Sequence, residues 1–139
     1  MLTRSQIEAC VPHAGAMCLL DSVLQWDATT IVCEAAAPGA AHPLARAGGV
    51  PAVAAIEYAA QATAVHGALL EGTQSPQAGL LAKLSDVELS VSMFDETAGP
   101  VTVRATVLSR NPSGCMYTFD VSDQRACVAR GRLIVALQP

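Results

Sequence analysis

Apolar and polar residues alternate through the C-terminal half of the chain, as in the run Val87, Glu88, Leu89 and Ser90. A period of two is typical of a strand that buries one face and exposes the other. Turn-forming residues, such as the run Asn-Pro-Ser-Gly, interrupt this alternation. The pattern therefore predicts four consecutive strands, at residues 80–93, 100–110, 115–122 and 125–137.

The N-terminal part of the chain predicts a short helix and a hairpin. Thr3 and Gln6 have the spacing of a capping box, which favours a helix over residues 4–9 that ends before Pro12. Two apolar runs, MCLLDSVLQW and TTIVCEAAA, follow on either side of a short polar break. Runs of this kind predict a pair of antiparallel strands, at residues 17–26 and 29–37.

The middle of the chain predicts one long helix that follows an irregular loop. Residues 35–49 are rich in Ala, Pro and Gly, and Pro51 suits the first turn of a helix because its missing N–H would have no partner there. From Ala52 to about Leu70 the chain is apolar nearly all round, so we expect this helix to be buried on every side. Together these elements predict an α+β protein, one domain over residues 1–139, whose antiparallel sheet wraps around the helix.

Composition narrows the classes of function. The chain is 52% hydrophobic and 14% charged, yet it has no apolar run of the ~20 residues that would span a bilayer. So large an apolar share indicates surface that is buried against a second subunit or that lines a pocket for an apolar ligand. A net charge of −4 without basic clusters argues against nucleic-acid binding. The N-terminus lacks the features of a signal peptide, so we expect a cytoplasmic protein.

The cysteines and histidines do not have the spacing of a metal site. The five cysteines include no Cys-x-x-Cys pair, and we expect them to be small buried apolar residues rather than disulfides. The histidines likewise lack metal-ligand spacing, so we predict no metal and no cofactor. His66 is expected to be a core or interface residue. His13 could reach a pocket, but a structural role before the first strand is the favoured interpretation.

Glu57 is the candidate catalytic acid. It is the one Asp, Glu, Lys or Arg residue between positions 52 and 70, inside the most apolar segment of the chain. Burial of a carboxylate is costly and favours its protonated form, which can donate a proton. Gln61, four residues later, is the neighbour on the same helix face that could hydrogen-bond it. The alternative is that Glu57 reaches solvent or pairs with an arginine from the sheet.

His42 is the candidate base. It lies fifteen residues before Glu57, at the head of the loop that leads into the helix. An ordinary histidine titrates near pH ~6.5, and the free N–H groups at a helix N-terminus can polarise a carbonyl. A base, an acid and a carbonyl-polarising group are what proton removal next to a thioester carbonyl requires. The alternative is that His42 is simply an exposed loop histidine.

Three motifs occur in the order seen in one enzyme family. The opening VPHAGAMCLLDSV, the loop histidine and the helix IEYAAQATA resemble those of the hotdog-fold 3-hydroxyacyl-[acyl-carrier-protein] dehydratases, over essentially the whole chain. The segments HPLA, GVPA and IEYxAQ and the ending LIVALQP are similar, in particular, to the dehydratase-like subunits associated with aryl polyene biosynthesis. The loop AHPLARAGGVPA is one residue longer than the usual one, and Pro43 replaces its phenylalanine.

The resemblance implies roles for individual residues. The family's loop histidine and helix carboxylate correspond to His42 and Glu57, as base and acid. The backbone N–H that polarises the carbonyl falls on Ala52, and Gln61 would orient Glu57. Arg46, in the same loop, could meet the phosphate of a pantetheine arm, although an exposed, solvated arginine is the favoured interpretation.

The resemblance also implies a substrate and a partner. The substrate would be a thioester of acyl carrier protein or of coenzyme A. The protein would be a dimer, with itself or with a related hotdog subunit, in which each site takes its histidine from one subunit and its acid from the other. Two alternatives stay open: a hotdog thioesterase, in which the carboxylate activates water, and a non-catalytic partner subunit. A lipid-binding or scaffold protein would not need the buried carboxyl.

Overall fold

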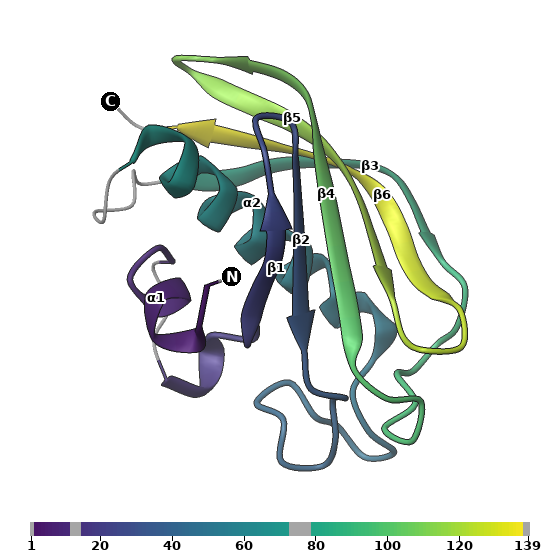
Figure 1. Cartoon of the computed structure of the whole chain (residues 1–139). Coiled ribbons are helices and arrows are strands. Elements are labelled where there is room, and N and C mark those ends of the chain that lie inside the picture. Colours follow the sequence, from purple (N-terminus) through teal and green to yellow (C-terminus); the bar gives the residue numbers. More distant parts are fainter. Residues whose placement is uncertain (1, 12–14, 73–78, 138–139) are drawn as a thin grey trace.

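An antiparallel sheet curls around one long helix in the computed structural model, which describes residues 2–11, 15–72 and 79–137 (Figure 1). The sheet has six strands in the order β1-β2-β4-β5-β6-β3. This arrangement confirms the predicted α+β fold. In chain order the elements are α1 (Arg4–Glu8), the 3₁₀ turn η1 (Gly15–Met17), β1 (Ser22–Trp26), β2 (Thr30–Ala35), the 3₁₀ turn η2 (Ala52–Ala54), α2 (Ala55–Glu71), β3 (Gly79–Leu89), β4 (Val101–Asn111), β5 (Gly114–Ser122) and β6 (Cys127–Leu137).

Helix α2 forms where the sequence predicts it, but its first turn is a 3₁₀ turn, η2. The helix ends at Gly72, whose φ of 67° is left-handed and suits glycine because it has no Cβ. On the side facing the sheet, Tyr58 and Val65 are fully buried in the same core as Val103 and Leu133. The apolar face of α2 and the inward side chains of the strands therefore build one hydrophobic core.

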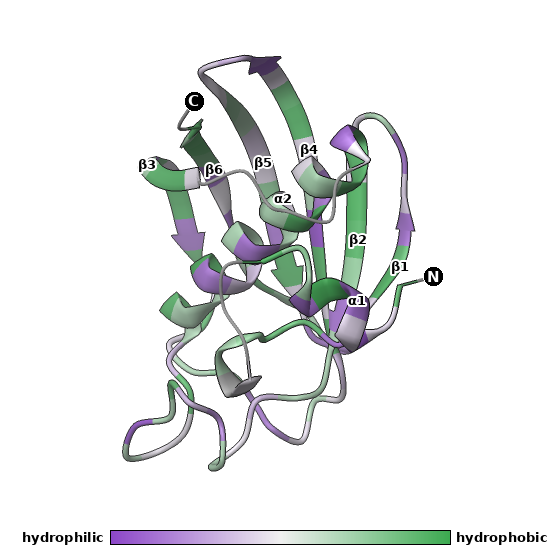
Figure 2. Cartoon of the chain, turned by 90° about the vertical axis from the view of Figure 1, so that its left-hand side faces the viewer, coloured by the Kyte–Doolittle hydropathy of each residue, from purple (hydrophilic) through white to green (hydrophobic). Residues whose placement is uncertain are grey.

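The opposite face of α2 is less buried, so the prediction of burial on every side is wrong for the single chain. This outer face of α2 consists of residues that follow one another at intervals of three or four, and Figure 2 shows the helix in front of the concave side of the sheet. Val53 is 54% exposed and the others are half-buried. The cause is that one curved sheet covers only one side of a helix. The outer face comprises Val53 of η2, which leads into the helix, and Glu57, Ala60, Ala64 and Gly67 of α2.

Strand β3 also differs from its predicted pattern. One dry face was expected, but nearly the whole strand is exposed, including Leu80, Leu81 and Leu84. The strand lies at the edge of the sheet and pairs only with β6. Its register shifts twice, and Asp86 within the second irregularity has a φ of 55°. Position in the sheet, which a local pattern does not contain, decides the exposure.

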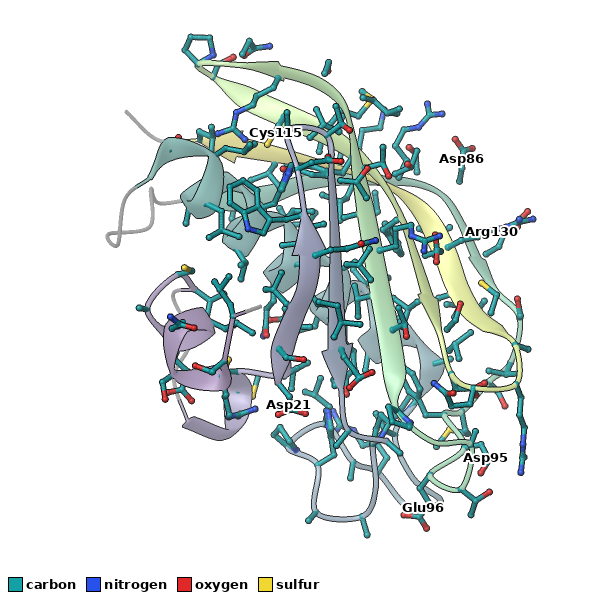
Figure 3. The ribbon with its side chains drawn as sticks, in the orientation of Figure 1. Asp21, Asp86, Asp95, Glu96, Cys115 and Arg130 are labelled. Atoms are coloured by element: carbon teal, nitrogen blue, oxygen red, sulfur yellow. The ribbon has the colours of Figure 1, made fainter. Side chains whose placement is uncertain are left out.

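The segment before β1 is not a strand, contrary to the prediction for residues 17–26. The Arg4 guanidinium donates to the Cys18 carbonyl at 2.6 Å, to the Gly15 carbonyl at 3.0 Å and to the Asp21 carboxylate at 2.9 Å. These bonds hold the segment against α1, which forms as predicted, with the Thr3 N–H donating to Gln6 Oε1 at 2.9 Å. Figure 3 shows Asp21 where this part of the molecule meets the loop that precedes η2.

The cysteines behave as predicted. All five are free, four of them are buried and Cys127 is half-buried. Burial raises the pKa of the Cys33 thiol to about 12, so this residue packs as a neutral side chain. Within the described ranges, no helix is long and apolar enough to cross a membrane.

His66 is a core histidine, one of the two predicted possibilities. It is fully buried, with Nε2 at 2.8 Å from the Asp27 carbonyl and Nδ1 at 2.7 Å from the Tyr117 hydroxyl. A carbonyl can only accept, so Nε2 carries the hydrogen and the Tyr117 hydroxyl donates to Nδ1. Burial lowers the pKa of His66, which therefore stays neutral in the folded protein at neutral pH.

The pKa of His66 predicts how stability depends on pH. Because its pKa is lower in the folded than in the unfolded chain, the unfolded chain binds the extra proton first as pH falls below ~6.5. We expect the free energy of unfolding to decrease from pH 7 to pH 5, by at most about 1.4 kcal/mol per pH unit for this residue. Urea unfolding at several pH values measures the slope, and His66→Gln should flatten it. An equal slope in the variant would contradict the prediction.

Candidate active site

His42 lies in the loop between β2 and α2 and is fixed at both ring nitrogens. The Leu44 N–H donates to Nδ1 at 3.0 Å, and Nε2 lies 2.9 Å from the Tyr58 hydroxyl of α2. The backbone turns tightly here, because the His42 N–H donates to the Gly39 carbonyl and the Ala45 N–H to the His42 carbonyl, both at 3.0 Å. The loop thus holds the ring, half-buried, against the first turns of α2.

These contacts determine the state of the imidazole. Nδ1 accepts a hydrogen bond from the Leu44 N–H, so it must have a free lone pair. The neutral ring therefore carries its hydrogen on Nε2 and donates it to the Tyr58 oxygen. Partial burial lowers the pKa of His42, which favours this neutral form. In this arrangement neither ring nitrogen has an open lone pair. His42 must exchange these hydrogen bonds before it can accept a proton.

Tyr58 belongs to this site, and sequence reasoning missed it. Its side chain is 1% exposed, and its ring packs edge-on against Phe94 with 5.8 Å between centroids. Burial raises the pKa of Tyr58, and the charge of Asp21 raises it further, so the hydroxyl keeps its proton. The signal in the sequence was a hydroxyl group directly after Glu57 in a helix that is otherwise nearly all apolar.

A cavity of about 390 Å³ lies beside His42 and Tyr58. This volume is near the lower end of the ~300–1,000 Å³ typical of ligand pockets. Most of its wall consists of residues from the loop after β2, and the segment before β1, α1 and α2 supply the rest. The lining residues are Arg4, Cys18, Leu19, Asp21, Ala36, Ala37, Pro38, Gly39, Ala40, Ala41, His42, Pro43 and Tyr58.

Glu57 lies outside that lining, on the outer face of α2. Gln61 Nε2 donates to Glu57 Oε1 at 3.0 Å and to the Met17 carbonyl at 2.7 Å, and Gln61 Oε1 accepts from the Leu19 N–H at 2.9 Å. Gln61 is therefore in position to orient Glu57, as the spacing of four residues predicts. It also ties α2 to the segment before β1.

The Ala52 N–H is not available to a substrate in this structure, contrary to the prediction. It donates to the Ser92 carbonyl at 2.9 Å. The reason is a bridge between Pro51 and Met93, which pairs the start of the helix with the turn after β3. The sequence gives no local sign of this pairing, because the paired segments are some 40 residues apart.

Arg46 does not line the cavity. Arg46 is exposed and donates to the carbonyls of Leu44 and Ala45 in its own loop, at 3.4 and 3.2 Å, which agrees with the solvated arginine favoured above. His13 lies outside the described residues. Within the part of the chain that the structure describes, no group of three or more His, Cys, Asp or Glu side chains could hold a metal ion.

Comparison with known families decides the relationship. The model of the ApeP-like family, described as ApeP dehydratase, matches residues 5–139. The chain belongs to the ApeP-like family. This membership confirms the resemblance to the dehydratase-like proteins of aryl polyene biosynthesis and supports a dehydratase. Curated proteins gave no match.

Solved structures show that the ApeP-like chain has the predicted hotdog fold. The dehydratase heterocomplex ApeI:P from Xenorhabdus doucetiae is 21% identical, with a TM-score of 0.84 over 100% of this chain and 93% of that chain. A mutant thioesterase from Pseudomonas aeruginosa is 14% identical, with a TM-score of 0.66 over 99% and 96%. A mutant thioesterase from Staphylococcus aureus is 19% identical, with a TM-score of 0.65 over 85% and 93%. At these identities the likeness shows the fold alone.

Proposed function

We propose that this ApeP-like chain takes part in the dehydration of a 3-hydroxyacyl thioester, linked to acyl carrier protein or coenzyme A, to the trans-2-enoyl thioester, in fatty-acid or polyene biosynthesis. His42 removes the proton from the α carbon. Glu57 protonates the departing 3-hydroxyl, which leaves as water, and the electrons of the broken C–H bond form the double bond. This acid–base elimination exchanges no electrons with a cofactor.

The protein works in the cytoplasm, where free thiols such as its five cysteines persist.

The separation of His42 and Glu57 within one chain carries the proposal of a two-subunit site. His42 lines the cavity and bonds to Tyr58, whereas Glu57 lies on the outer face of α2, outside the cavity lining. Two groups that act on one substrate must meet, and a second hotdog subunit covering the outer face of α2 would bring a histidine to Glu57. ApeI:P is described as a heterocomplex, which supports a related subunit as the partner, although a second copy satisfies the same geometry.

The edge of the sheet supports the same assembly. Strand β3 presents unpaired backbone groups and exposed leucines, and an exposed apolar edge is a surface onto which another strand can pair. The outer face of α2 is a second partly exposed surface. Both surfaces stay partly exposed only while the chain is alone.

Substitution of Leu84 tests this interface. Leu84 is 37% exposed on β3, so a lysine there is tolerated by the single chain but opposes strand pairing at the edge. We expect Leu84→Lys to reduce the mass measured by light scattering to that of a single chain. Leu108→Lys on β4 is the matched control, because Leu108 is 49% exposed but lies on an interior strand. Dissociation by both variants, or by neither, would contradict the role of β3.

A second candidate function is a non-catalytic subunit that completes a partner's site. The observation that favours it is the bonding of both His42 ring nitrogens, to Leu44 and to Tyr58. If this arrangement persists in the assembly, His42 is not a base. In the leading proposal, the arrival of the second subunit or of substrate breaks these bonds and frees the ring.

Mass spectrometry distinguishes the candidates. The protein, alone and with the hotdog subunit that purifies with it, is incubated with short, long and aryl-bearing 3-hydroxyacyl thioesters. Loss of one water from the acyl group supports the dehydratase, and release of the free acid would instead indicate a thioesterase. Water loss that needs the partner but is unchanged by His42→Ala would establish the non-catalytic subunit. The absence of water loss under every condition would overturn the proposal.

A further inference from the structure

The hydrogen of the Tyr58 hydroxyl is not donated to His42. Because the Leu44 N–H fixes Nδ1 as the acceptor, the hydrogen between the two side chains belongs to Nε2 of His42, and the Tyr58 oxygen accepts it. Within the described residues, no second partner of this hydroxyl is recorded. A hydroxyl that accepts one hydrogen bond becomes a stronger donor of another. Tyr58 lines the cavity, so a ligand there can approach its hydroxyl.

Two other candidate donors are already bonded. The Ala52 N–H, which the family resemblance implied for the carbonyl, donates to the Ser92 carbonyl. Arg4 lines the cavity too, but its terminal nitrogens are bound to the Asp21 carboxylate and to backbone carbonyls. In this structure neither Ala52 nor Arg4 has a hydrogen-bond donor free for a substrate carbonyl.

Tyr58 and His42 are neighbours beside the cavity, as one particular fragment of a substrate requires. Their polar atoms lie 2.9 Å apart. In a thioester, the carbonyl oxygen and the α carbon are attached to the same carbon atom, so a base for the α proton and a donor for the oxygen must also be neighbours. The wall built from the small loop residues 36–41 leaves room for a short apolar acyl segment.

We propose that the Tyr58 hydroxyl is a catalytic group that donates a hydrogen bond to the carbonyl oxygen of the acyl thioester in the cavity. The proposal rests on the proposed function, which supplies the thioester. When His42 turns to take the α proton, Tyr58 keeps its own hydrogen and stabilises the negative charge that develops on the oxygen. Tyr58 thereby replaces the Ala52 N–H in the mechanism.

Infrared difference spectroscopy tests the hydrogen bond without turnover. The probe is trans-2-butenoyl-coenzyme A with an isotope-labelled carbonyl carbon, added to the protein with the partner that purifies with it. A hydrogen bond weakens the C=O bond, so we expect the labelled band to move to lower frequency in wild type and to move back in Tyr58→Phe. We also expect Tyr58→Phe to weaken binding of the probe about five- to tenfold, the loss typical of one hydrogen bond.

Tyr117→Phe is the matched control. Tyr117 is also a buried tyrosine bonded to a histidine, His66, but it is not among the residues lining the cavity. We expect this variant to keep the band shift and the affinity of wild type, even if it lowers stability. An equal change in both variants would indicate a structural effect and overturn the proposal, as would a wild-type band that does not shift.

The outcomes separate this inference from the proposed function. A carbonyl shift that depends on Tyr58, together with no water loss from any 3-hydroxyacyl thioester, would keep the hydrogen bond and overturn the dehydratase. Water loss with a rate unchanged by Tyr58→Phe would keep the dehydratase and overturn the role of Tyr58. Under the combined proposal, Tyr58→Phe lowers kcat more than it raises KM, because the bond strengthens as charge develops on the oxygen.

Discussion

We expect replacement of Glu57 by glutamine to lower the rate of the proposed dehydration by about two to four orders of magnitude, the contribution typical of a general acid. Glutamine has nearly the same shape, and its side-chain oxygen can still accept the hydrogen bond that Gln61 Nε2 gives to Glu57. The variant therefore loses the acidic proton while keeping the contact. The measurement is the initial rate of water loss, followed by mass spectrometry in the assembled protein.

Glu71→Gln is the control for this substitution. Glu71 lies at the far end of the same helix, where its carboxylate forms a partly exposed ion pair with Arg110 at 3.3 Å. Such a pair contributes little to stability, so we expect a rate close to wild type. A rate in the Glu57→Gln assembly equal to that of wild type would show that another group is the acid, and would favour the non-catalytic subunit.

The elements of the fold that were predicted correctly are those fixed by local patterns. Strand β5 is flanked on both sides by other strands and alternates strictly between buried and half-buried residues, so its period of two directly reports the inner and outer faces of the sheet. The exposure of β3 depends on its place at the edge. The irregular path of residues 18–21 depends on the distant guanidinium of Arg4. Neither the edge position of β3 nor the hydrogen bonds of Arg4 can be predicted from the local sequence pattern.

The candidate site divides in the same way. The hydrogen bond between Gln61 and Glu57 follows from helical spacing alone and was expected. Two other hydrogen bonds join distant or irregular segments of the chain. They link the Ala52 N–H to the Ser92 carbonyl and His42 to the Tyr58 hydroxyl. An aromatic residue in an apolar helix is ordinarily part of the core, which is why Tyr58 did not stand out. The hydrogen bond within the helix could be predicted from the sequence, but those that join distant or irregular segments could not.

We expect removal of the His42 side chain to change the rate of dehydration as much as Glu57→Gln does, and to change how the rate depends on pH. We expect His42→Ala to lower the rate of dehydration by about two to four orders of magnitude, as loss of a general base does. In the proposed mechanism His42 acts as the base only when it is neutral, and burial lowers the pKa of His42. Activity should therefore persist as pH falls and decline only below the ~6.5 of an ordinary histidine. The profile of kcat/KM against pH measures this decline, the acidic limb of the profile.

His66→Gln is the control that makes the pH profile decisive. Burial lowers the pKa of His66 as well, but this residue lies in the core, bonded to Tyr117 and Asp27, and does not line the cavity. If the acidic limb reported loss of the fold, His66→Gln would shift it. If the acidic decline reports protonation of the base, it occurs at the same pH in His66→Gln as in wild type. The small residual rate of His42→Ala then shows no such decline. A limb that survives in His42→Ala would assign the base to another residue, which the partner would have to supply.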